Sequence, residues 1–253
     1  MKHKILSTKA LQKDYINGNN TTSVLKDIDL EIYDGDFTVI MGPSGSGKST
    51  LLYCLSGIDS VTSGKVWFND KEISGLGEKE IAALLAGEFG FVFQQMHLVS
   101  NLTLFENIAV AGYHSKKYKS SEVNSRTEEL LKKVNLTEQQ NNLPSQCSGG
   151  EQQRAAVARA LIKKPKLVLT DEPTGLLNQS NSQQVLDLLT QVNSAGQSVL
   201  MVTHDVKSAI RASRILYLED GNIRGELKLP SYSADDKKSR EAKVSEWLNK
   251  MMW

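Results

Sequence analysis

The sequence contains no long hydrophobic run. Nowhere do roughly 18 apolar residues follow one another, the length that a membrane-spanning helix needs. The nearest approach, residues 81–93, is shorter and carries Glu88 in its middle, which favours a helix followed by a strand. The first residues also lack the apolar core of a secretory signal peptide. These absences favour a protein that stays in the cytosol.

Cysteine is also scarce, and neither sign of charge dominates. Cys54 and Cys147 are far apart and belong to no Cys-x-x-Cys pair, so the sequence indicates neither a metal site nor a disulfide framework. We expect two buried, reduced thiols. The 30 Lys and Arg residues nearly balance the 29 Asp and Glu residues, so no overall field attracts nucleic acid or anionic lipid, and only a local basic patch could. The 253 residues suffice for one large domain or two small ones.

The sequence does contain a glycine-rich loop between an apolar run, residues 37–41, and a helix-compatible stretch, residues 50–56. Such glycines let the backbone point N–H groups into one anion-sized hollow, and the following helix adds its positive end. Lys48 would place a charge on the β- and γ-phosphates, and Ser49 carries the hydroxyl that such loops offer to Mg²⁺. A plain glycine-rich turn is the alternative, but the spacing and both flanking elements favour a nucleoside triphosphate site. The loop residues are Gly42, Pro43, Ser44, Gly45, Ser46, Gly47, Lys48, Ser49 and Thr50.

Carboxylates and a histidine follow two further apolar runs. Residues 167–170 are continuously apolar or nearly so, as in a buried parallel sheet, and end at Asp171 and Glu172. Asp171 could hold Mg²⁺ through water, and Glu172 could accept a proton from an attacking water. Residues 198–203 end in the same way at His204. Such carboxylates are often only solvated and a lone histidine is often structural, but the upstream phosphate loop favours a catalytic interpretation.

Three further positions give weaker signals. Ser148, Gly149 and Gly150 stand at the start of an alanine-rich helix and could form a second anion site, although such a sequence is more often a flexible cap. Gln94 follows the strand-like residues 89–93 and, taken alone, would be a surface glutamine. Tyr15, taken alone, would be a strand residue on a half-buried face.

The order of these elements predicts an α/β fold around a P-loop NTPase core with a mostly parallel sheet. Residues 5–40 alternate loosely and contain the turn signals Asn17-Gly18 and Asp34-Gly35, which favours an N-terminal antiparallel β subdomain. Residues 104–136 have helical spacing. We therefore expect an inserted helical subdomain over about residues 95–164.

The end of the chain differs in character from what precedes it. We expect a nucleotide-binding domain over residues 1–230, followed by a polar linker and a short amphipathic helix over residues 231–253. The apolar residues of this tail fall at helical spacing, which indicates that they pack on the body of the protein or on a partner. They are Val244, Trp247, Leu248 and Met251.

Together these motifs resemble the ATP-binding subunit of ABC transporters, over roughly residues 5–228. By that likeness Tyr15 stacks on adenine, Gln94 reaches Mg²⁺ and the attacking water, Glu172 is the catalytic base, and His204 senses the γ-phosphate. The resemblance implies a head-to-tail homodimer with ATP at its interface, a separate membrane permease, and a place on the cytoplasmic face of the membrane. The likeness implies that Mg²⁺ is held by Ser49, Gln94 and Asp171. It also implies that the signature closing on the partner's ATP consists of Ser148, Gly149, Gly150 and Glu151.

Within that family, the segments 41–50, 91–95 and 170–175 look like the macrolide-exporter and lipoprotein-release branch. The bacitracin- and lantibiotic-resistance transporters resemble the chain most, also in Asn178 and in the tail that ends in Trp253. This analogy points to an antimicrobial peptide, or its lipid-bound target, as the ligand of the whole complex.

Three positions depart from the usual pattern of the family. Cys147 stands where the signature usually opens with leucine, and a small hydrophobic residue should pack there equally well. Glu151 stands where glutamine is usual and adds charge beside a phosphate site. Leu176-Leu177-Asn178 replaces Ala-Leu-Asp, so Asn178 keeps hydrogen-bonding capacity but loses a charge, and communication between the ATP sites is expected to differ.

Other members of the superfamily predict other features. A DNA-repair or chromosome-structure ATPase would carry a long heptad insertion between the loop and the signature, and the sequence has none. A translation factor would carry two sets of nucleotide motifs. A cell-division or sensory ATPase that transmits force through a membrane partner stays an alternative to a transporter. In either case we expect the permease surface near residues 96–107.

Overall fold

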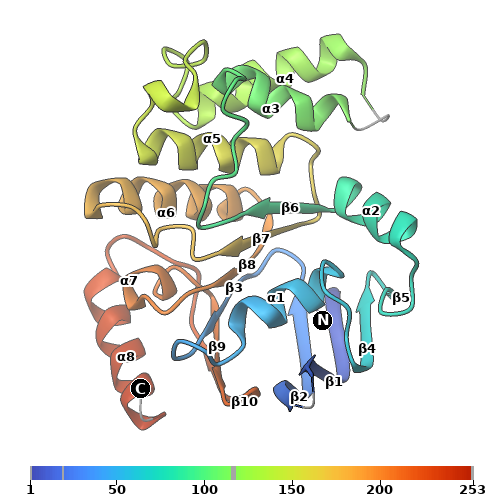
Figure 1. Ribbon diagram of the computed structural model, residues 1–253. Helices are drawn as coiled ribbons and strands as arrows, with labels where there is room; N and C mark the ends of the chain where they lie inside the picture. Colours follow the sequence, from blue (N-terminus) through green and yellow to red (C-terminus); the bar gives the residue numbers. More distant parts are fainter. Residues whose placement is uncertain (1, 19, 115–117, 252–253) are drawn as a thin grey trace. The chain divides into compact units, whose positions relative to one another are not determined.

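The chain divides into two compact units. The computed structural model describes residues 2–18, 20–114 and 118–251, so Trp253 lies outside the described residues. One unit comprises Met1–Ala82 and Gly196–Trp253, and the other comprises Ala83–Ala195. Figure 1 labels the helices and strands of both units.

The first unit contains an antiparallel sheet built from the N-terminal part of the chain. β1 and β2 pair in antiparallel fashion and meet at the turn that Asn17-Gly18 predicts, where Gly18 has a φ of +61°. The predicted antiparallel subdomain is therefore confirmed, and β1 carries Tyr15 near its end. The strands, in the order β2-β1-β4-β5, are β1 (Lys4–Asn17), β2 (Asn20–Tyr33), β4 (Ser63–Phe68) and β5 (Lys71–Glu72).

The same unit contains the strand that leads into the glycine-rich loop. β3 (Phe37–Met41) is parallel to both of its neighbours, β8 (Ser198–Val202) and β9 (Arg214–Glu219), and β10 (Asn222–Lys228) pairs antiparallel with β9. Every residue of β3 and β8 is buried, which explains their apolar sequences. Because the carboxyl ends of parallel strands meet at one edge of a sheet, the loop after β3 and the residue after β8 emerge at the same edge. The helices that follow are α1 (Lys48–Ser56) and α7 (Val206–Ala209).

The second unit is mainly helical. The boundary between the units falls within α2 (Glu78–Gly87), which leads into β6 (Phe89–Val92). Strand β6 pairs in parallel with β7 (Leu167–Asp171). Helix α3 packs on α4 and α5, and α5 packs on α6 (Figure 1). Arg126 of α4 ties these helices together, because its guanidinium donates to the carbonyls of Leu161 and Ile162 at the end of α5. The helices are α3 (Leu104–Tyr113), α4 (Ser120–Lys133), the 3₁₀ turn η1 (Pro144–Gln146), α5 (Gly149–Leu161) and α6 (Gln179–Ser194).

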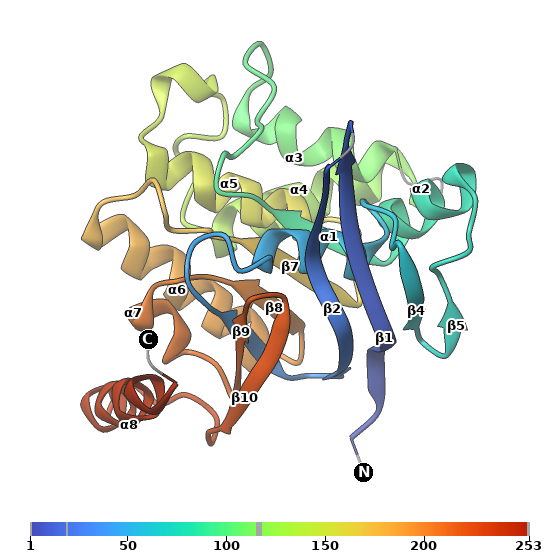
Figure 2. The ribbon, with the colours of Figure 1, turned by 60° about the horizontal axis from the view of Figure 1, so that its bottom comes forward.

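The tail forms helix α8 (Lys237–Lys250), which packs on the unit to which it belongs (Figure 2). Val244 and Leu248 are fully buried, and the edge of Trp247 meets the ring of Tyr217 in β9 at 6.4 Å between centroids. Arg240 is also buried, and its guanidinium donates to carbonyls at residues 210, 212 and 230. The apolar spacing of the tail thus corresponds to a docked helix.

The predicted α/β class is confirmed by these strands and helices. Among the described residues, no helix is both long and apolar enough to cross a membrane. One expectation about the thiols is corrected. Cys54 is buried, and burial raises the pKa of its thiol to about 12, but Cys147 is only half-buried because it lies in the extended link between η1 and α5.

Candidate functional site

The glycine-rich loop joins β3 to α1 and has the backbone that its sequence predicts. Gly45 and Gly47 have φ values of +81° and +98°, in the left-handed region that glycine adopts without strain. A Cβ atom on Gly42 would lie 2.0 Å from the carbonyl oxygen of Leu218 in β9, so no side chain fits there. Gly47 is the N-cap of α1 and brings no side chain to the first amides of that helix. The loop therefore has the form of an anion site at a helix N-terminus.

Lys48 supplies the charge of this loop. Its side chain is largely buried, and its ammonium donates to the carbonyls of Gly42 at 2.7 Å and Pro43 at 2.9 Å. The cation is thereby turned over the loop instead of extending into solvent. The hydroxyl of Ser46 is buried too, and it has no hydrogen-bond partner among the residues that the structure describes. A buried hydroxyl without a partner costs free energy, which a ligand oxygen in the loop would recover.

Tyr15 and His204 lie in the same unit as the loop. Tyr15 is 43% exposed, so part of its side chain is accessible to a ligand. Its hydroxyl donates to the carboxylate of Asp59 at 2.6 Å. His204 is exposed between β8 and α7, and the adjacent Asp205 fixes the start of α7 by accepting from two backbone amides of that helix.

Gln94, Asp171 and Glu172 lie in the other unit, and the structure brings them to one neighbourhood. Asp171 is the last residue of β7, and Glu172 begins the following turn with a φ of +45°, an unusual value for a residue with a side chain. The turn closes when the amide of Gly175 donates to the carbonyl of Glu172 at 3.0 Å. A Cβ atom on Gly175 would lie 2.6 Å from Nε2 of Gln94, so the glutamine side chain packs directly against this turn.

The predicted signature begins α5. Ser148 is the N-cap, and its side chain and that of Glu151 form a reciprocal capping box. Glu151 accepts from the Ser148 amide at 2.7 Å and from its hydroxyl at 2.8 Å, and these bonds hold the pKa of Glu151 below its ordinary value. A Cβ atom on Gly150 would lie 2.4 Å from Cγ of Asn181 in α6, which leaves room only for glycine. The extra charge of Glu151 is therefore engaged in capping its own helix.

Asn178, the other notable departure in sequence, has an equally definite place. It is the N-cap of α6, and its side chain accepts from the amide of Asn181 at 2.9 Å. Aspartate is an equally good N-cap residue. Asparagine in place of the family's usual aspartate at position 178 therefore removes a charge but keeps the N-cap of α6.

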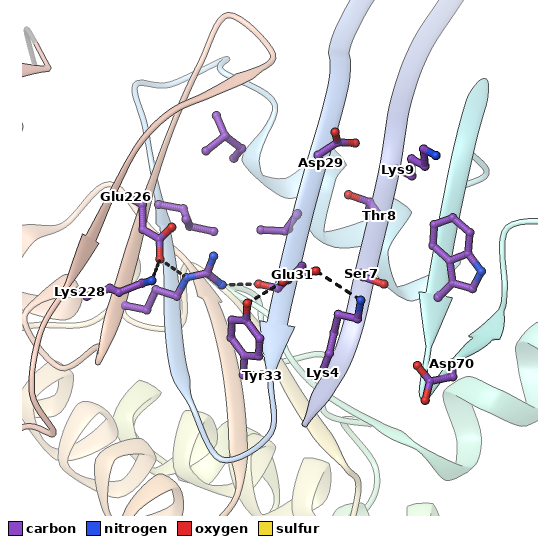
Figure 3. Close-up of a pocket in the computed structure, with 15 residues that line it drawn as sticks. Lys4, Ser7, Thr8, Lys9, Asp29, Glu31, Tyr33, Asp70, Glu226 and Lys228 are labelled. Atoms are coloured by element: carbon purple, nitrogen blue, oxygen red, sulfur yellow. Dashed lines mark hydrogen bonds and ion pairs between the residues drawn. The ribbon is translucent and has the colours of Figure 1, made fainter. Parts of the chain in front are cut away.

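A separate groove of about 830 Å³ lies on the first unit, between the antiparallel sheet and strands β9 and β10. Figure 3 shows its charged residues interacting with one another. Lys4 pairs with Glu31, and both Arg214 and Lys228 pair with Glu226. These ion pairs within the groove offset much of its positive charge.

The loop, its lysine and the parallel strand before it define a P-loop nucleotide-binding fold. Residues 25–175 match the family described as ABC transporter. The chain belongs to the ABC transporter family, whose ATP-binding cassettes hydrolyse ATP to ADP and phosphate. The predicted family is thereby confirmed.

Curated relatives include macrolide export ATP-binding/permease proteins called MacB. That of Mannheimia succiniciproducens is 42% identical over 219 residues, which cover 87% of this chain and 34% of that protein. That of Pasteurella multocida is 40% identical over 223 residues, which cover 88% of this chain and 34% of that protein. The chain therefore spans about a third of the length of the curated relatives that it matches.

Solved structures of cassettes resemble the chain over most of its length. One is a dimeric post-hydrolysis state of the ATP-binding cassette MJ0796 bound to ADP and phosphate, with a TM-score of 0.83 and 36% identity. Another dimeric structure of MJ0796, described as a bacterial ABC transporter cassette, has a TM-score of 0.83 and 37% identity. Each comparison covers 90% of this chain and 100% of the other.

Proposed function

We propose that this chain binds ATP in the loop 42–50 and uses its hydrolysis to drive a separate membrane permease, as part of an export system like that of MacB. The observation that carries the proposal is Lys48, whose ammonium is held over a glycine loop by two carbonyls. A cation in that place binds β- and γ-phosphate oxygens. The unpartnered Ser46 hydroxyl in the same loop supports a ligand rich in oxygen atoms.

The proposed metal ligands suit Mg²⁺. Ser49 offers a hydroxyl, Gln94 a carbonyl oxygen and Asp171 a carboxylate, and Mg²⁺ prefers such oxygen donors, often with water between ion and protein. We propose that these three residues hold it, Asp171 through water. When bound, the ion would neutralise charge on the phosphate oxygens.

The remaining residues divide the chemistry of hydrolysis. Glu172 accepts the proton of the attacking water, Gln94 orients that water, and His204 contacts the γ-phosphate. The packing of Gln94 against the Glu172–Gly175 turn supports a shared task for the first two residues. Tyr15, which is exposed and belongs to the same unit as the loop, stacks on the adenine.

The working unit that we propose is a head-to-tail homodimer on the cytoplasmic face of the membrane. In it, Ser148, Gly149, Gly150 and Glu151 of one subunit close on the ATP of the other. The dimeric structures described for MJ0796 support this assembly. The helix N-terminus at Ser148 supports the role in anion binding, because its amides carry partial positive charge.

The permease surface is proposed to include a groove of about 320 Å³ in the second unit. Phe91 and Phe93 stack there with ring centroids 5.6 Å apart, and His97 meets the ring of Phe93 edge-on. Arg159 of α5 holds the adjoining loop by donating to the carbonyls of Met96 and His97. An aromatic groove beside the segment 96–107, where the surface is expected, suits an apolar helix or loop of the permease.

The whole complex is proposed to confer resistance to antimicrobial peptides. Deleting the gene should sensitise the host to bacitracin-like and lantibiotic peptides more than to macrolides, and the parent gene should restore resistance while a Glu172→Gln copy should not. Unchanged susceptibility to the peptides would remove this substrate class. Restored resistance without ATP-dependent uptake of labelled peptide into inverted vesicles would instead favour an ATPase that transmits force without export.

Affinity purification in mild detergent would identify the permease.

A further inference from the structure

We propose that Asp59 and Lys13 are positioning residues that fix the ring of Tyr15 for stacking on the base of a nucleoside triphosphate. This inference rests on the proposed binding of ATP in the loop 42–50. It concerns residues that the sequence motifs of the chain do not include, and it follows from three contacts in the first unit.

Asp59 joins the two other residues through its carboxylate. Oδ2 accepts from the hydroxyl of Tyr15 at 2.6 Å, and Oδ1 accepts from the ammonium of Lys13 at 2.6 Å. The same ammonium donates to the carbonyl of Ser60 at 2.7 Å, which fixes the lysine itself. Each oxygen of the carboxylate therefore has its own donor, and the tyrosine hydroxyl has one preferred direction.

The chain segment that carries Asp59 belongs to the end of the phosphate-loop helix. Gly57 ends α1 in the left-handed conformation, and the amide of Asp59 then donates to the carbonyl of Tyr53 in that helix. The end of the helix that receives the phosphates is thus tied, through Asp59, to the tyrosine that receives the base. The distance between the two half-sites is set by one rigid helix.

Burial and charge keep this arrangement in one protonation state. The side chain of Lys13 is 8% exposed and that of Asp59 is 26% exposed. Burial acts to raise the pKa of Asp59, but the hydrogen bonds from Lys13 and Tyr15 outweigh it, so the pKa lies below its ordinary value. The hydrogen bond to Asp59 raises the pKa of Tyr15, so the phenol keeps its proton and remains a donor at neutral pH.

Lys13 also restricts how a base can approach. Its ammonium lies over the ring of Tyr15, 4.8 Å from the centroid, where a cation is attracted to the negative face of the ring. A planar base can then stack on the face that the lysine does not cover. A ring fixed before binding loses less conformational freedom when the ligand binds, which is worth about a two- to tenfold gain in affinity.

The test compares a ligand that has a base with one that has none. Titration calorimetry would measure the affinity of the full chain for ATP and for inorganic tripolyphosphate, both with Mg²⁺. The variants are Tyr15→Phe, which keeps the ring, Asp59→Asn, and the two combined, with Asp70→Asn as a matched control at an exposed turn. Steady-state hydrolysis would give KM and kcat for each.

We expect Tyr15→Phe and Asp59→Asn each to weaken ATP binding about two- to tenfold and to raise KM, with kcat and tripolyphosphate affinity unchanged. The double variant should bind ATP no more weakly than the weaker-binding of the two single variants, because both substitutions act on the same Tyr15–Asp59 hydrogen bond. Tyr15→Phe leaves the Lys13–Asp59 ion pair intact, so it decides the matter if Asp59→Asn folds poorly.

Two results would overturn the inference: parental ATP affinity in Tyr15→Phe, or losses in the two single variants that multiply in the double variant. A parent chain that binds neither ATP nor tripolyphosphate would instead refute the proposed function of the loop, and this inference with it. The comparison of the two ligands therefore tells the two failures apart.

Discussion

Arg240 should contribute more to the stability of the first unit than any charged residue on the outer face of the same helix. Its guanidinium donates to the carbonyls of Ile210 at 2.8 Å, Pro230 at 2.8 Å and Ala212, and the side chain is almost completely buried. Arg240→Ala would remove all of these donors at once. The bonds to Ile210 and Ala212 are fully buried, so water cannot readily replace the lost donors.

The expected cost follows from those two buried carbonyls. Leaving a buried polar group without its partner costs about 1–3 kcal/mol. The third carbonyl, that of Pro230, is only partly buried, so water can replace its lost donor at little cost. From the two buried carbonyls together, we expect Arg240→Ala to lower the free energy of unfolding by about 2–5 kcal/mol. Deleting residues 231–253 should cost at least as much, since it also exposes the surface that Val244 and Leu248 cover.

Urea denaturation followed by tryptophan fluorescence would measure this cost, since Trp247 contacts Tyr217 in the same unit. Lys243→Ala is the matched control, because Lys243 is exposed on α8, and its effect should stay within about 0.5 kcal/mol. An Arg240→Ala variant that unfolds at the same urea concentration as the control would refute the reasoning. It would mean that the carbonyls find other donors at no cost.

Three further predictions concern the nucleotide chemistry. Lys48→Ala should abolish productive ATP binding, measured by calorimetry, and unchanged ATPase activity would refute the assignment of the loop. Glu172→Gln should slow hydrolysis about 10²- to 10⁴-fold while ATP binding survives, so that an ATP-bound dimer accumulates on a sizing column. A Glu172→Gln variant with the parental rate would show that Glu172 is not the base. Asn178→Asp should keep the cap of α6 and ATP binding by the monomer, but alter the rate or cooperativity of hydrolysis. Identical kinetics would mean that the missing charge has no mechanistic weight.

The sequence predicts the elements of this fold well because most of them are locally determined. The apolar residues of β3 and β8 lead to parallel strands that are buried throughout, and the spacing of Val244 and Leu248 gives a docked helix. Gly45 and Gly47 adopt the left-handed conformation that suits the tight turn of the glycine-rich loop.

What the sequence does not predict depends on contacts between distant residues. Asp59 lies 44 positions from Tyr15, and nothing in either neighbourhood indicates that they pair. Arg240 stands among other charged residues of the tail, most of which are exposed. Nothing in the sequence indicates that Arg240, unlike these neighbours, is buried. The same holds for Gly150, whose lack of a side chain is explained only by Asn181 of the adjacent helix.

The capping box at the start of α5 implies a competition for a single proton. A serine hydroxyl can donate one hydrogen bond at a time, and Ser148 donates to the carboxylate of Glu151. Any acceptor that takes this proton, such as a phosphate oxygen, therefore has to displace an anion of the protein's own chain. An ionised carboxylate is a stronger acceptor than a glutamine amide. When an anionic ligand binds Ser148, the serine hydroxyl must stop donating to the carboxylate of Glu151 and donate to the ligand instead. The residue at position 151 therefore sets how strongly the protein itself competes with the ligand for this hydrogen bond.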